Sequence, residues 1–185
     1  QQIHLSVELR EFADVVERCK SAILEAHRHK DVTAELLLLA DQGSAYQRNG
    51  NALEAMRCAN QIITQAEKEN IPYLMARGLL LKGILQISQG FERDATETFH
   101  HAAAYASEHG FLPLLARVEN KLGIAYQQAG KYRLSIQHNE RALQIARDLN
   151  MKRDEAETIH NLAIVLASLG RNEESILFIR QGRDL

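Results

Sequence analysis

The sequence predicts an all-α solenoid of antiparallel helix pairs, and three series of residues spaced forty apart predict it. One series marks a helix end in each repeat and consists of Gly50, Gly90, Gly130 and Gly170. The other two hold small residues where helices cross: Gly43, Gly83, Gly123 and Ala163, then Ala55, Ala95, Ser135 and Ser175. A fixed period of this length is typical of repeat proteins in which each unit buries its apolar face only against its neighbours.

Composition and charge narrow the range of functions. The 185 residues are 45% hydrophobic and 25% charged, as in ordinary globular proteins. The 22 basic and 24 acidic side chains give a net charge of −2 and form no basic stripe, so we expect no nucleic-acid partner. We also expect no membrane partner and a cytoplasmic location, because the sequence has no long apolar run and no signal-peptide pattern.

The first helix of each repeat is expected to begin near Leu36, Ala76, Ala116 and Ala156. Apolar or small residues follow at helical spacing, as in Leu122, Gly123, Ala125 and Tyr126. The glycine of the first series then ends the helix, because a residue without Cβ adopts the left-handed backbone conformation at little cost.

The second helix places Ser135, Asn139, Ala142 and Ala146 on one face at steps of three and four residues. Its predicted end is again periodic, at Asn70, Gly110 and Asn150, each followed by an apolar residue. Pro72 and Pro113 fall in the first turn of the next helix, where a missing N–H costs little.

These signals predict a single solenoid over residues 1–185. The repeats are expected near residues 32–70, 72–110, 112–150 and 152–185, after a second helix of an incomplete repeat at residues 8–30. We therefore expect an excised piece of a longer protein. Its uncapped apolar ends would favour self-association.

The cysteines and histidines form no pattern typical of a metal or catalytic site. Cys19 and Cys58 make no paired-cysteine motif, and Cys19 lies at a packing position of the repeat. His100 and His101 are adjacent and therefore face different sides of a helix. The glycines are isolated helix ends rather than a phosphate-binding loop. We expect no metal, no cofactor and no catalysis by these residues.

At Leu122–Gly123, Tyr126, Gly130, Tyr132, Ser135 and Ala142 the chain resembles the tetratricopeptide repeat family. The forty-residue period is similar to a long-repeat subgroup found in animal polarity adaptors. The same subgroup occurs in bacterial transcription activators, peptide-sensing regulators and cyclic-dinucleotide enzymes. The resemblance implies a right-handed superhelix in which the first helix of each repeat lines a concave groove.

The resemblance also implies which residues line this groove: Arg77, Leu80, Ile84, Ile87, Arg117, Asn120, Ile124, Gln127, His160 and Ile164. The isoleucines suggest an apolar stripe, and the arginines suggest contacts with carboxylates. An amphipathic segment with acidic residues is therefore the expected partner. In the alternative interpretation, the isoleucines pack between repeats and the arginines pair within the chain.

The leading interpretation is a protein–protein interaction module that binds a peptide or helix, as part of a larger bacterial signalling or regulatory protein. Two alternatives remain. One is a regulatory sensor domain that binds a small ligand or short peptide and controls an attached output domain. The other is a structural role in which the repeats stack end to end or dimerise.

Overall fold

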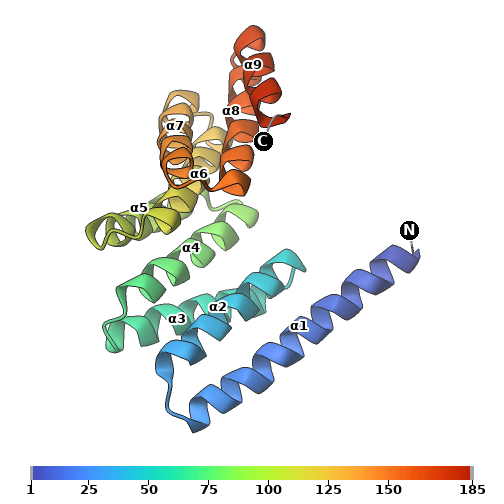
Figure 1. Cartoon of the computed structure of the whole chain (residues 1–185), viewed down its shortest axis with the longest axis vertical. Helices are drawn as coiled ribbons and strands as arrows, with labels where there is room; N and C mark the ends of the chain where they lie inside the picture. Colours follow the sequence, from blue (N-terminus) through green and yellow to red (C-terminus); the bar gives the residue numbers. More distant parts are fainter. Residues whose placement is uncertain (1, 184–185) are drawn as a thin grey trace. The chain divides into compact units, whose positions relative to one another are not determined.

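The computed structural model describes residues 2–183, with side chains from residue 12 onward, and this range is built from helices and short connections (Figure 1). The helices are α1 (Gln2–Arg28), α2 (Val32–Arg48), α3 (Ala52–Lys68), α4 (Pro72–Ser88), α5 (Glu92–Glu108), α6 (Leu112–Gln128), α7 (Tyr132–Asp148), α8 (Lys152–Ser168) and α9 (Asn172–Arg183). The prediction of an all-α helical-repeat solenoid is thereby confirmed.

The chain forms two compact units, residues 1–85 and residues 86–185, whose boundary falls within the last turn of α4. In the first unit, α1 packs on α2 and α2 packs on α3. In the second unit, each of the helices α5–α9 packs on the next in the chain, and α6 also contacts α8 (Figure 1). Each predicted repeat from residue 32 onward contains two consecutive helices.

Left-handed residues end the helices at the predicted positions. Gly50, Gly90, Gly130 and Gly170 have φ between 69° and 80°, while Asn70, Gly110 and Asn150 have φ between 53° and 69°. The amide of the following residue closes each turn, as where Asn51 N donates to Tyr46 O at 2.9 Å. Lys30 also has a positive φ of 56°, at a position where the sequence gives no glycine or asparagine.

The core of each unit is formed by aliphatic and small side chains. Leu36, Ile62 and Leu74 are almost fully buried in the first unit, and Phe99 and Leu122 in the second. No helix among the described residues is both long and apolar enough to cross a bilayer.

The small residues of the periodic series bring α6 and α7 into close contact. A Cβ added to Gly123 would overlap the side-chain amide of Asn139, which is fully buried. Ser135 Oγ donates to Gly123 O at 2.7 Å, and Ser175 Oγ donates to Ala163 O at 2.8 Å one repeat later. The small residues thus serve both packing and hydrogen bonding where the two helices of a repeat cross.

Candidate functional site

In the first unit, the predicted groove residues lie on α4 beside α2. Arg77 Nη2 donates to Asp41 Oδ1 of α2 at 3.0 Å. Leu80 and Ile84 are half-buried, and so is Ile87, which follows them on α4 and already belongs to the second unit. The arginine expected to meet a partner's carboxylate therefore already has a carboxylate of this chain beside it.

In the second unit, two further ion pairs connect the first helices of consecutive repeats. Arg117 Nε of α6 donates to Asp154 Oδ1 of α8 at 3.0 Å, and Lys121 Nζ donates to Glu157 Oε1 at 2.6 Å. Both pairs are partly exposed, and such pairs typically contribute about 0–1 kcal/mol. Because they are weak, a carboxylate from a partner can exchange with them at low cost.

The remaining groove candidates of the second unit differ in exposure. Ile164 is 40% exposed and His160 is exposed, whereas Ile124 and Gln127 are half-buried. The isoleucine positions of this unit are therefore accessible to a ligand to different degrees. Ile164 offers the larger apolar contact.

Asn120 departs from the expectation that it lines the groove. It is only 4% exposed, and its Nδ2 donates to Thr158 Oγ1 at 3.1 Å and to Asn139 Oδ1 at 3.4 Å. Its Oδ1 has no hydrogen-bond partner among the described residues. Asn120 thus links α6 to α7 and α8 from within the core, where a partner in the groove does not reach it.

A buried carboxylate on α6 organises a polar cluster that the sequence did not predict. Glu119 is 1% exposed. Its Oε2 lies 2.6 Å from His138 Nδ1, and its Oε1 lies 3.1 Å from Arg141 Nη1. Both partners are on α7. The contact could not be predicted from the nineteen-residue spacing between Glu119 and His138, because it depends on how α6 and α7 align side by side.

Aromatic rings extend this cluster to α5. The rings of Tyr126 and His138 stack with centroids 5.1 Å apart, and His100 Nε2 lies 2.9 Å from the Tyr126 hydroxyl oxygen. Tyr126 also lines a pocket of about 400 Å³ together with residues of α5 and Lys131, whose Nζ is 5.9 Å from the Tyr126 ring centroid. The cluster joins three consecutive helices through groups that change charge or donate hydrogen bonds.

The His100 side chain gives the stability of this unit a predicted pH dependence. Burial, and secondarily the nearby His138, lower the pKa of His100 below its usual value, although the residue remains exposed enough for solvent to limit the shift. The unfolded chain then binds more protons than the folded chain as the pH falls through the ordinary histidine range of about 6.5. Stability is therefore expected to decline in that range.

The His100→Gln variant tests this dependence, because glutamine does not titrate. We expect its melting temperature to fall less than that of the parent chain between about pH 7 and pH 5. The measurement is a thermal unfolding series for both proteins in matched buffers. A constant difference between the two melting temperatures across that range would contradict the expectation.

The described residues contain no group of three or more His, Cys, Asp or Glu side chains arranged to hold a metal ion. The arrangement consists instead of helix faces, weak ion pairs and pockets open to solvent. These features are typical of a helical-repeat protein.

The fold can now be compared with known proteins. Residues 114–185 match the tetratricopeptide repeat family, and the fold of the chain is that of tetratricopeptide-like repeat proteins. The resemblance predicted from the residues around Leu122 and Gly123 is thus confirmed. No curated protein sequence matches the chain.

Solved structures with the same fold are distant in sequence. BtubC from P. vanneervenii is 16% identical with a TM-score of 0.78, over 92% of this chain and 72% of that one. A Rap protein in complex with competence and sporulation factor is 13% identical with a TM-score of 0.84, over 97% of this chain and 50% of its own. The Rap conjugation gene regulator of plasmid pLS20, in complex with the Phr* peptide, is 19% identical with a TM-score of 0.76 and the same coverage.

Proposed function

We propose that this chain is a protein-interaction module that binds a peptide or helix along the first helices of its repeats. The observation that carries the proposal is the accessible apolar position Ile164, 40% exposed, on a helix whose charged residues are held in weak ion pairs. The apolar side chain supplies an anchor, and the exchangeable pairs accommodate acidic residues of the ligand.

Two of the similar structures support a peptide as the ligand. One Rap protein was solved with competence and sporulation factor, and the other with the Phr* peptide. This chain spans half of each of those proteins. We further propose that the module is part of a cytoplasmic signalling or regulatory protein of a bacterium. Peptide binding to the module would then control an attached output domain.

The Ile164→Asp variant is expected to lose peptide binding while keeping its fold. A charge on the groove face costs binding because the apolar side chain of the ligand loses its partner and the aspartate is desolvated. Peptides selected from a random display library on the parent chain are the probes, and their affinities are compared by calorimetry. We expect a loss of at least about tenfold, with an unchanged far-UV circular dichroism spectrum.

Leu134→Asp is the matched control, since Leu134 is 38% exposed and lies on α7, outside the predicted groove. It should leave the affinity unchanged. Ile124→Asp is expected to weaken binding as well, and loss of the folded spectrum in that variant would place Ile124 in the core. The proposal fails if the selected peptides bind Ile164→Asp and the parent chain equally well.

A further inference from the structure

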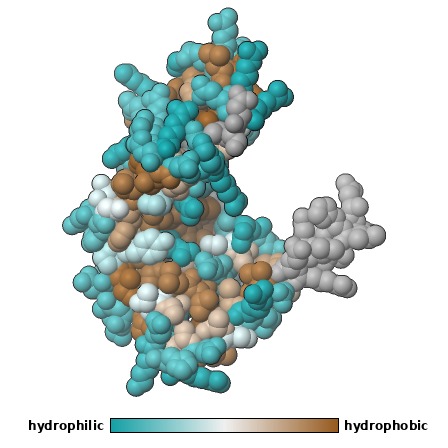
Figure 2. Space-filling view, in the orientation of Figure 1, coloured by the Kyte–Doolittle hydropathy of each residue, from teal (hydrophilic) through white to brown (hydrophobic). Residues whose placement is uncertain are grey.

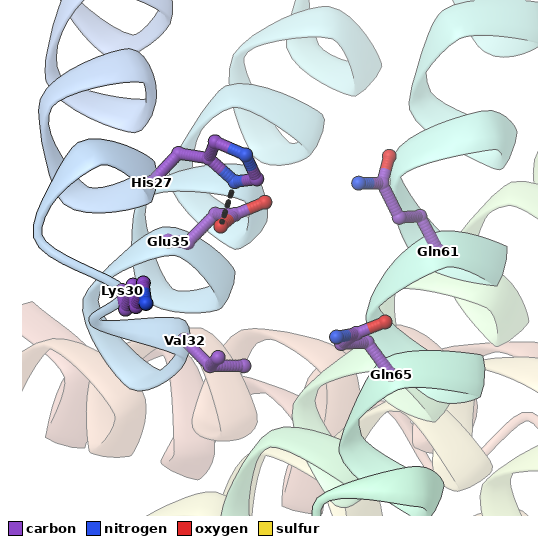
Figure 3. Close-up of a pocket in the computed structure, with 6 residues that line it drawn as sticks. All are labelled: His27, Lys30, Val32, Glu35, Gln61 and Gln65. Atoms are coloured by element: carbon purple, nitrogen blue, oxygen red, sulfur yellow. Dashed lines mark hydrogen bonds and ion pairs between the residues drawn. The ribbon is translucent and has the colours of Figure 1, made fainter.

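A polar pocket in the first unit lies away from the predicted groove residues. It has a volume of about 470 Å³ and lies where α1 ends, α2 begins and α3 passes by. Its lining consists of His27, Lys30, Val32, Glu35, Gln61 and Gln65. Figure 3 shows His27 and Glu35 facing the two glutamine amides across the opening. In the space-filling view of Figure 2, hydrophobic residues (brown) gather over α2–α4, and hydrophilic residues (teal) surround them.

The second unit carries the same positions 120 residues later, which is three repeat periods. Arg147 stands for His27, Glu155 for Glu35 and Gln181 for Gln61. Arg147 Nε donates to Glu155 Oε1 at 3.0 Å, and its Nη2 donates to Gln181 Oε1 at 3.3 Å. One guanidinium group thus connects a carboxylate on one helix with an amide on the next.

Histidine is too short to make this connection in the first unit. His27 Nδ1 lies 3.2 Å from Glu35 Oε2, and the pocket occupies the space between this pair and the two glutamines. The middle repeats have Met75 and Leu115 at the position of the glutamate, so they lack the carboxylate. The arrangement is therefore shared by the first and last repeats, and only the last one contains its own guanidinium.

The charges around the two equivalent carboxylates can also be compared. Glu155 has two cationic neighbours, because Lys152 Nζ lies 3.5 Å from its Oε2 in addition to Arg147. Val32 stands at the position of Lys152, so Glu35 has no lysine there. Lys30 adds one positive charge to the pocket lining. The pairing around Glu155 shows that an ammonium and a guanidinium are accommodated beside one such carboxylate.

We propose that this pocket binds a guanidinium group, which takes the place that the Arg147 guanidinium has in the second unit. The planar group donates to the Glu35 carboxylate and to the Gln61 amide oxygen, a geometry that an ammonium matches less well. The group comes either from an arginine side chain of a protein partner or from a small guanidinium compound. This site is independent of the groove proposed above.

The test is an NMR titration of the isotope-labelled chain with N-acetylarginine amide, read at the side-chain amides of Gln61 and Gln65. We expect saturable shifts with a dissociation constant on the order of millimolar, as suits so small a ligand. N-acetylcitrulline amide, which has nearly the same shape and no charge, should give no saturation. An arginine-containing hexapeptide that binds at least about tenfold more tightly than N-acetylarginine amide indicates a protein partner. Equal affinity of the two probes indicates a small guanidinium compound.

Two exchanged variants make the test specific. His27→Arg supplies the guanidinium from the chain itself and should abolish binding in the first unit. Arg147→His should open a second pocket and produce shifts at Gln181. Glu35→Gln should also abolish binding, and it serves if His27→Arg alters the fold. The proposal is overturned if the citrulline probe binds as well as the arginine probe, or if folded His27→Arg and Glu35→Gln retain the parent affinity.

Discussion

Gly123→Ala is expected to destabilise the chain by about 2 kcal/mol, although alanine favours a helix over glycine by about 1 kcal/mol. The new Cβ would overlap the side-chain amide of Asn139, which is fully buried. Overpacking costs about 1–3 kcal/mol, and displacing a buried amide from its hydrogen bonds costs a similar amount. These two costs together exceed the gain in helix propensity. Urea unfolding followed by circular dichroism measures the difference.

The double variant Gly123→Ala/Asn139→Ala provides the control for this effect. With the amide removed, the added methyl group meets no atom of residue 139 beyond Cβ, so the second substitution should recover part of the loss. Strict additivity of the two single variants would show that Gly123 and Asn139 do not compete for space. An alanine at 123 that stabilises the chain would refute the overlap argument altogether.

Cys58 is expected to react with iodoacetamide at about pH 8 at least about 100-fold more slowly in the folded chain than in denaturing urea. The residue is 6% exposed, and burial raises the pKa of its thiol to about 11. The thiolate is the form that reacts, and an ordinary cysteine thiol has a pKa of about 8.5. Folding therefore lowers both the fraction of Cys58 that is thiolate and the access of iodoacetamide to its sulfur. Mass spectrometry of the tryptic peptides gives the labelling rate of each cysteine separately.

Cys19 serves as an internal comparison, since it is also buried, at 8% exposure, and burial raises the pKa of its thiol as well. Both cysteines should therefore be protected. Labelling of Cys58 at the rate of the unfolded chain would mean that α2 and α3 separate readily around it, contrary to the packing described.

The helix ends could be predicted from the sequence because a glycine or an asparagine, the residues that most readily adopt the left-handed backbone conformation, stands at the predicted ends. Gly50 and Asn70 illustrate this, as both have a positive φ where the sequence predicts a helix to end. Lys30 occupies the corresponding position before α2 with φ 56°. The sequence predicted a helix to end at residue 30, but not this left-handed conformation, because a lysine has no intrinsic preference for it.

The groove could be predicted only approximately, since one residue along a helix turns the side chain by about 100°. Asn120 shows the result, because it was expected in the groove and is instead buried, with its Nδ2 donating to Thr158 Oγ1. The partners of Arg77 and Arg117 depend on which carboxylate lies opposite on a neighbouring first helix, which is α2 for Arg77 and α8 for Arg117. That register comes from packing between repeats and is not encoded in the spacing along one helix.

The regular length of the helices has a consequence for how such a chain changes in evolution. Each of the helices α2–α8 has 17 residues, and three-residue connections separate them. A duplication or deletion of forty residues therefore recreates the types of junction that already exist, and no new core has to be invented. The number of repeats, and with it the number of stacked helix pairs, is inherited as a copy number.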